Sequence, residues 1–259
     1  MKPLLLLFAC LLSLTSPVFS QQPAHIVIMV VEEPFNYDAP TTMGDFAAKD
    51  LRPLGHRVTV ILGDQPEKHR FPGLVEALKD ADLLILFSRR RFPPKEQLSA
   101  IRAHLEAGKP LLGIRTANHA FIPVPTETVT DPALATWPEF TPEVLGGQNT
   151  GYETKGLPYT VSIAPGAESS PLLQGVDPAT IQGHKSLYKV LPLAADTMPV
   201  LIGTAQAPST TPPQPVAWTR HHGPNKAPIF YTSLGAADDL KIPAVRQLLL
   251  NGVKWTLGR

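Results

Sequence analysis

Cysteine is almost absent from this sequence, because Cys10 is the only one among 259 residues. It lies in an apolar N-terminal stretch that has the pattern of a secretory signal, so we expect the exported chain to carry no thiol. A disulfide framework, a cysteine nucleophile and a cysteine-bound metal are therefore excluded from the mature protein.

An excess of one charge is also lacking, since 23 basic residues stand against 22 acidic ones. A nucleic-acid-binding chain usually has a basic face, so we expect no nucleic-acid partner. After the N-terminal stretch, no apolar run approaches the ~20 residues that span a bilayer, and we expect no membrane association after signal cleavage. The oligomeric state stays open, and a homo-oligomer is compatible with the sequence.

The N-terminal stretch combines a positive residue, an apolar core and small residues before a cleavage point. Lys2 precedes the apolar run Leu4–Leu14, and Val18–Ser20 fits a cleavage site before Gln21. We therefore expect a signal peptide at 1–20, a mature domain at 21–259 and export to the periplasm or the medium. A buried N-terminal helix and a lipoprotein anchored at Cys10 are the alternatives.

Buried strands and amphipathic helices alternate through the first half of the chain. Apolar runs predict strands at His25–Val31, Arg57–Leu62, Asp82–Phe87 and Pro110–Ile114. Helical spacing of apolar residues predicts helices at Thr42–Leu54, Gly73–Leu78, Pro93–Gly108 and Pro243–Leu257. This alternation predicts a single α/β domain with a mostly parallel sheet and helices on both faces.

The second half is less regular. Residues Ala117–Gly156 show poor periodicity, and a long loop inside a compact domain is usually functional. Shorter strands of mixed or antiparallel direction are predicted at Tyr159–Ile163, Pro199–Ile202, Pro215–Thr219 and Pro228–Thr232.

Polar residues follow two of the predicted parallel strands, where ligands bind in open sheets. Arg89, Arg90 and Arg91 follow one strand, while the turn after the next carries Arg115 and ends at Asn118 and His119. Arginine at this edge is suited to carboxylates, phosphates or sugar hydroxyls, and His119 is suited to proton transfer or metal binding. A solvated loop and a structural histidine are the alternative interpretations.

Further candidates lie near other predicted strand ends. Glu32 and Glu33 follow the first strand. Either one could act as a base or form an ion pair with one of the arginines, including Arg115. The remaining candidates are His184, Tyr188, Asp238 and Asp239. No histidine pair has metal-ligand spacing, and no glycine-rich phosphate loop is present, which argues against a flavodoxin-like cofactor binder.

Several segments are similar, in the same order, to the secreted branch of the ThuA-like trehalose-utilisation family. They are Ser88–Phe121, Trp137–Gly147, Ser186–Ala194, Pro215–Thr219 and Phe230–Trp255. The resemblance implies the fold of class I glutamine amidotransferases, with Arg115 at the turn where those enzymes carry cysteine, and so no glutaminase reaction.

The resemblance also implies a role in the metabolism of disaccharides and their keto derivatives. Some members look metal-binding, but Gln148, Thr150 and Ala236 stand where the family tends to have histidine, which weakens a divalent-metal role. We therefore expect an exported protein that binds or processes a sugar or keto-sugar. In a catalytic protein His119 would transfer the proton, assisted by Glu32 or His184. A binding protein that has lost the chemistry is the alternative.

Overall fold

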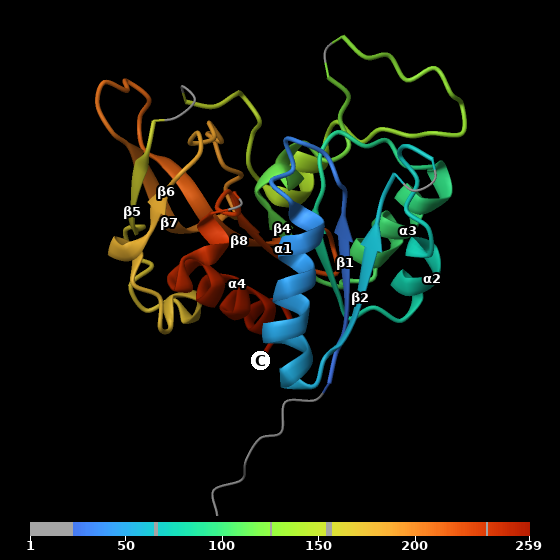
Figure 1. Cartoon of the computed structure of the whole chain (residues 1–259), viewed down its shortest axis with the longest axis horizontal. Helices are drawn as coiled ribbons and strands as arrows, with labels where there is room; N and C mark the ends of the chain where they lie inside the picture. The colour runs from blue at the N-terminus through green and yellow to red at the C-terminus, as the bar shows by residue number, and fades with distance from the viewer. Residues whose placement is uncertain (1–22, 65–66, 125, 154–156, 237) are drawn as a thin grey trace, which may run out of the picture.

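The computed structural model describes residues 23–64, 67–124, 126–153, 157–236 and 238–259. The expected signal peptide, its cleavage point and Cys10 lie outside these ranges. Within them, one sheet runs through the molecule and helices cover both of its faces (Figure 1). No helix in the described part of the chain combines the length and the apolar character that a membrane span requires.

The sheet has nine strands in the order β2-β1-β3-β4-β9-β8-β7-β5-β6. Pairs from β2 through β1, β3 and β4 to β9 are parallel, and the remaining pairs are antiparallel. The strands are β1 His25–Val30, β2 Arg57–Leu62, β3 Leu83–Phe87, β4 Leu111–Ile114, β5 Tyr159–Ile163, β6 Gln182–Gly183, β7 Met198–Ala205, β8 Gln214–His222 and β9 Ala227–Thr232.

The longer helices divide between the two faces of the sheet. One face is covered by α1 Ala39–Phe46 and α4 Pro243–Thr256, and the other by α2 Leu74–Lys79 and α3 Lys95–Glu106. The first helix continues as a π-helical turn, η1 Ala47–Leu51, and a 3-10 turn, η2 Arg52–Leu54. The other short turns are η3 Arg115–His119, η4 Phe140–Leu145, η5 Pro171–Leu173, η6 Pro178–Thr180 and η7 Asp239–Lys241.

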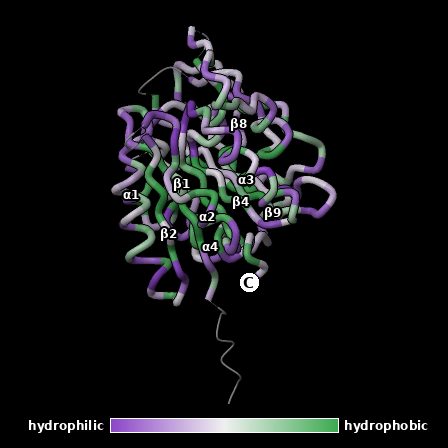
Figure 2. The backbone as a smooth tube through the Cα atoms, turned by 90° about the vertical axis from the view of Figure 1, so that its right-hand side faces the viewer, coloured by the Kyte–Doolittle hydropathy of each residue, from purple (hydrophilic) through white to green (hydrophobic). Residues whose placement is uncertain are grey.

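The apolar runs that predict β1 and β3 are buried on both sides. Alternate residues of β1 pack in opposite directions, Ile26 and Ile28 towards α1 and α4, Val27 and Met29 towards α2 and α3. Burial of each such side chain stabilises the fold by about 1.5–3 kcal/mol. The apolar centre between polar outer segments is visible in Figure 2. The predicted α/β architecture is therefore confirmed.

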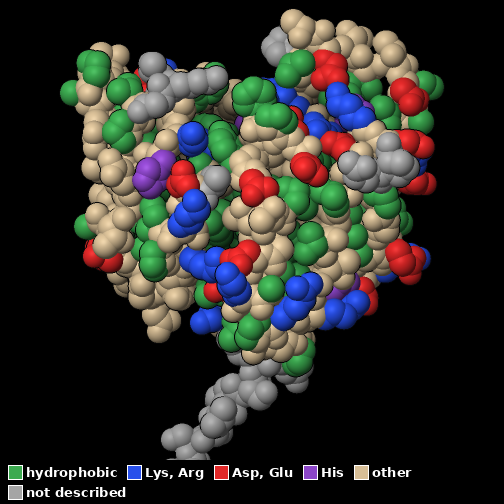
Figure 3. Space-filling view, in the orientation of Figure 1, with side chains coloured by type: hydrophobic (Ala, Val, Ile, Leu, Met, Phe, Trp, Pro, Cys, Tyr) green, Lys and Arg blue, Asp and Glu red, His purple; other side chains and the backbone are tan. Residues whose placement is uncertain are grey.

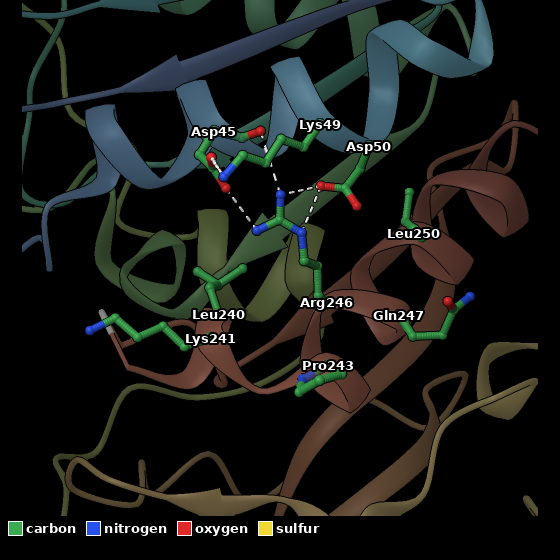
Figure 4. A pocket seen from close by; sticks show the side chains of 9 residues that line it. All are labelled: Asp45, Lys49, Asp50, Leu240, Lys241, Pro243, Arg246, Gln247 and Leu250. Carbon is green, nitrogen blue, oxygen red and sulfur yellow. Dashed lines mark hydrogen bonds and ion pairs between the residues drawn. The ribbon is translucent and has the colours of Figure 1, made fainter.

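Ion pairs join α4 to α1 and to its continuation η1 on the outside of the molecule. Arg246 Nε lies 2.7 Å from Asp50 Oδ2, and its Nη1 lies 2.9 Å from Asp45 Oδ2 (Figure 4). Basic and acidic side chains alternate over the face that carries these helices, with no large area of one sign (Figure 3). The balanced composition thus corresponds to a balanced surface on this side.

Residues 117–124 and 126–153 are more ordered than their sequence indicates. They contain η4 and a cluster of buried rings, Phe121, Trp137 and Phe140, with Phe121 and Phe140 at a centroid distance of 4.9 Å. These aromatic residues are irregularly spaced, so no helical or strand period reveals them. The cluster packs against α3 and fixes the chain that leaves the end of β4.

Candidate functional site

The ends of β3 and β4 lie side by side, because Leu86 and Gly113 are partners in a parallel pair. Backbone hydrogen bonds join the segments beyond these ends, from Arg90 N to His119 O at 3.0 Å and from Arg91 N to Ala120 O at 2.7 Å. Both polar segments therefore open on one edge of the sheet.

Arg89 is the arginine of its run that belongs to this edge. Its Nη1 lies 3.2 Å from Glu33 Oε1, and its guanidinium lies 5.0 Å from the centre of the Phe35 ring. Both charged side chains are about one-fifth exposed, at 18% and 20%. Phe35 is 59% exposed. An ion pair with an apolar ring beside it is therefore accessible from solvent.

Arg90 and Arg91 point elsewhere. Arg90 has a left-handed backbone, with φ 46°, and donates to Pro123 O at 2.9 Å. Arg91 is buried and contacts both carboxylate oxygens of Asp64, with Nη2 2.6 Å from Oδ2. Arg91 therefore anchors the loop after β2, and Arg90 anchors the long loop after η3.

Arg115 occupies a strained turn directly after β4. Its φ of 41° is in the left-handed region, which costs a non-glycine residue on the order of 1–3 kcal/mol. The 3-10 turn η3 begins at Arg115 itself and runs to His119, so the chain turns away directly at the end of the strand. The backbone carbonyl of Arg115 accepts a hydrogen bond from Tyr231 Oη at 2.7 Å, which helps to hold the turn.

The side chain of Arg115 is 1% exposed and has no carboxylate partner among the described residues. Its guanidinium donates to Ser233 O at 2.7 Å, and to Ser186 O and Tyr37 Oη at 3.3 Å each. It also lies 4.7 Å from the Tyr37 ring and 4.6 Å from the Tyr188 ring. Carbonyl oxygens and aromatic faces thus balance this buried cation.

The expected pairing of Glu32 or Glu33 with Arg115 is wrong. Glu33 pairs with Arg89 and lies 3.9 Å from Arg91, while Glu32 is exposed. The reason is the direction of the Arg115 side chain. Its guanidinium points into the protein and lies against the rings of Tyr37 and Tyr188, away from both glutamates. Its role in holding a ligand stays a prediction.

His119 and Asn118 are buried together at the end of η3. His119 Nδ1 hydrogen-bonds Asn118 Oδ1, and the His119 ring lies 6.0 Å from that of Tyr188. Burial lowers the pKa of His119 well below its ordinary value, and the nearby charges of Arg90, Arg89 and Arg115 lower it further. The imidazole is therefore neutral at physiological pH.

His184 and the two aspartates lie beyond β9 and β6. His184 is partly exposed, with Nδ1 3.5 Å from Asp239 Oδ1. Asp239 is buried, and its Oδ2 accepts from Gly235 N and Ala236 N at 2.9 and 3.0 Å. Asp238 instead pairs with Lys241 at the surface. Within the described ranges, no hydrogen bond or ion pair joins His184 or Asp239 to His119.

Four residues of this edge escaped the sequence reasoning: Phe35, Tyr37, Asp64 and Tyr159. The first three follow β1 or β2, so the same strand-end rule would have found them. Tyr159 begins β5, which runs antiparallel to its neighbours. Its hydroxyl is buried beside the charges of Arg115 and Asp239, and burial raises its pKa. Nothing in the local sequence places it there.

Among the described residues, the side chains of this edge do not form a ligand set that suits a divalent metal ion. Across the residues that the structure describes, no three histidine, cysteine or acidic side chains are grouped as ligands. His119 faces three arginines, whose charges oppose a second cation. Ala236 is buried, and Gln148 and Thr150 bond through their backbones to the 189–190 segment.

Comparison with known proteins decides the family. The family model described as ThuA, trehalose utilisation, matches residues 46–256. The chain belongs to the ThuA family. None of the curated proteins matches the sequence.

Solved structures similar to this ThuA chain share its fold at low identity. A protein titled as ThuA-like from Bacteroides uniformis ATCC 8492 is 15% identical with a TM-score of 0.62, covering 90% of this chain and 91% of its own. Another, from Parabacteroides merdae ATCC 43184, is 14% identical with a TM-score of 0.66, covering 91% and 90%. The mmIFT52 N-terminal domain is 13% identical with a TM-score of 0.52, covering 89% and 96%.

Proposed function

We propose that this ThuA protein binds a sugar or a keto-sugar derived from a disaccharide at the strand-end site, defined as Glu33, Arg89, Arg115, His119 and Tyr188. The observation that carries the proposal is the Arg89–Glu33 pair beside the exposed Phe35 ring, with the neutral His119 on the segment that is hydrogen-bonded to Arg90. The family description as trehalose utilisation supports carbohydrate as the ligand class.

The chemistry of the accessible groups suits a neutral polyol better than an anion. Arg89 offers guanidinium donors, Glu33 offers carboxylate acceptors, and their mutual pairing leaves little net charge. Phe35 presents an apolar ring of the kind that lines small-molecule sites. The buried guanidinium of Arg115 does not face the ligand. It packs against the ring of Tyr188, and that ring lies close to His119.

Binding is tested by calorimetry and thermal shift on the purified full chain, with trehalose, other disaccharides and their keto derivatives. Arg89→Ala is expected to weaken binding at least about tenfold, a loss of ~1.4 kcal/mol. Arg102→Ala is the matched control, because Arg102 also lies over an aromatic ring, that of Trp137 at 3.5 Å, but outside the site. Equal affinities of the two variants would remove Arg89 from the site, and no binding of any probe would refute the proposed function.

Proton transfer by His119 is proposed as the chemical step, and binding without chemistry as the second candidate. The second candidate is favoured by the separation of His119 from His184 and Asp239, which leaves His119 without a histidine or carboxylate partner among the described residues. Assays of carbohydrate binding and turnover on the unaltered protein and on His119→Gln decide between proton transfer and binding alone. Loss of turnover with retained binding supports proton transfer, whereas absence of turnover in the unaltered protein supports binding alone.

We propose in addition that the protein is exported and cleaved after Ser20. The support is the order of positive residue, apolar run and small residues in the first twenty positions. N-terminal sequencing of the protein recovered outside the cytoplasm tests this, and recovery of an intact Met1 would refute it.

A further inference from the structure

The orientation of the His119 ring is fixed by its neighbour in sequence. Nδ1 faces Oδ1 of Asn118, and an amide oxygen only accepts hydrogen bonds, so Nδ1 carries the hydrogen. Asn118 is itself held in place, because its backbone carbonyl accepts from Thr141 Oγ1 of η4. Asn118 is 1% exposed and His119 is 9% exposed, so neither side chain has room to turn freely.

The opposite nitrogen, Nε2, then keeps a lone pair. It makes no hydrogen bond to any residue in the described ranges. The charged and titratable groups around the ring are Arg89 and Arg90 from the end of β3, Arg115 from the end of β4, and Tyr188 from the segment after β6. Their positive charges keep the imidazole neutral, so the lone pair persists at physiological pH.

We infer that Asn118 is a positioning residue that holds His119 in the Nδ1–H form, so that Nε2 accepts a hydrogen bond from a hydroxyl group of the ligand. The inference rests on the proposed function for the identity of that ligand, and it specifies how one hydroxyl is recognised. A keto or carboxylate group at the same point would place an acceptor against an acceptor. The surrounding arginines equally disfavour a metal cation at Nε2.

Nitrogen NMR of the imidazole rings tests the inference without any enzymatic assay. Uniformly ¹⁵N-labelled full-chain protein gives long-range proton–nitrogen correlations in which the protonated and the bare ring nitrogens resonate far apart. His119→Gln assigns the His119 signals. We expect Nδ1 protonated and Nε2 bare at about pH 7, slightly above the ordinary pKa of histidine.

His104 supplies an internal control with the opposite form. Its Nε2 lies 2.9 Å from Pro110 O, and a carbonyl oxygen only accepts, so His104 carries its hydrogen on Nε2. Signals of both forms are therefore expected in one spectrum. If His119 resembles His104, the inference is overturned.

Three variants separate positioning from simple structural support. Asn118→Ala is expected to shift the His119 signals away from the pure Nδ1–H form. Asn118→Asp is expected to retain that form, because a carboxylate still accepts from Nδ1–H, and to raise the pKa of His119. Asn251→Ala removes another buried asparagine, which donates to Leu172 O and Gln174 O far from the site, and is expected to leave the His119 signals unchanged. An unchanged spectrum in Asn118→Ala overturns the inference.

Addition of trehalose at saturating concentration tests the acceptor role. We expect the Nε2 signal of His119 to move while the signals of His104 stay fixed. Bound sugar without movement of Nε2 overturns the acceptor role while the proposed function survives. Failure of every carbohydrate probe to bind refutes the proposed function, and the spectrum of the free protein still decides the Asn118 inference.

Discussion

The guanidinium carbon of Arg115 lies 4.6 Å from the centre of the Tyr188 ring, and the ring of His119 lies 6.0 Å from the same tyrosine ring. Arg115 therefore influences the position of His119 indirectly, through its contact with Tyr188. The turn after β4 presents the side chain of Arg115 inward, where it donates to Ser233 O and Ser186 O. The turn is therefore used to organise neighbouring side chains.

Replacement of Arg115 by lysine is expected to lower the free energy of unfolding by about 1–3 kcal/mol. Lysine keeps the charge, but its single ammonium cannot reach Ser233 O, Ser186 O and Tyr37 Oη with the geometry of a planar guanidinium. Urea denaturation measures the change, with Arg102→Lys as the control. Unaltered stability of Arg115→Lys would show that the charge alone is sufficient.

Replacement of Glu33 by glutamine is expected to cost about 1–3 kcal/mol, between the values for exposed and fully buried pairs. It leaves Arg89, which is only 18% exposed, without its carboxylate partner. Asp238→Asn breaks the exposed pair with Lys241 and is expected to cause no measurable change. The prediction is contradicted if both variants unfold at the same urea concentration.

No ammonia is expected from glutamine in the presence of this protein. The turn after β4 carries Arg115, and the sequence has no cysteine after Cys10 to form an acyl-enzyme. A coupled glutamate dehydrogenase assay measures the release. Release that disappears in Arg115→Ala but persists in Arg102→Ala would show that this turn supports glutaminase chemistry.

Burial of His104 is expected to make stability fall in acid. Burial lowers the pKa of His104 from 6.5 to about 4. Between these two pH values the unfolded chain binds a proton at His104 and the folded chain does not. The contribution of neutral His104 to the free energy of unfolding is therefore complete above about pH 6.5 and is lost as pH falls to about 4. At the acid end the loss reaches about 3 kcal/mol.

His104→Gln isolates this contribution from that of the carboxylates. Glutamine retains an N–H donor for Pro110 O but does not titrate, so its unfolding free energy should fall less between about pH 6.5 and pH 4. Denaturation curves of both proteins across this range provide the comparison. Parallel pH profiles would assign the acid sensitivity to other groups.

The parallel part of the sheet is predictable because burial on both faces leaves a simple signature. The runs at β1 and β3 consist almost entirely of apolar residues, and their polar ends locate the edge where Arg89 and Arg115 emerge. The pairing of β4 with β9 is different, since Leu111 pairs with Ile229 across the intervening chain. No local pattern encodes a contact of that sequence separation.

The direction of individual side chains was the part of the site that sequence reasoning could not supply. The sequence places Arg115 correctly at the edge of the sheet where the parallel strands end. Its side chain nevertheless points inward, because its backbone is left-handed and its guanidinium donates to Ser233 O. Tyr37 became its partner through the conformation of the β1–α1 loop, where Tyr37 itself has a φ of 57°. Such backbone geometry depends on tertiary packing more than on local residue preference.

The run Arg89–Arg91 joins three separate parts of the chain to one short segment. Arg89 holds the β1–α1 loop through Glu33, Arg90 holds the chain after η3 through Pro123 O, and Arg91 holds the loop after β2 through Asp64. Adjacent residues therefore hold three segments of the chain, and Arg91 also donates to the carbonyl oxygens of Arg89 and Arg90. Deleting one residue here would displace all three side chains from their partners at once. This tripeptide should therefore tolerate a substitution at one position far better than any change in its length.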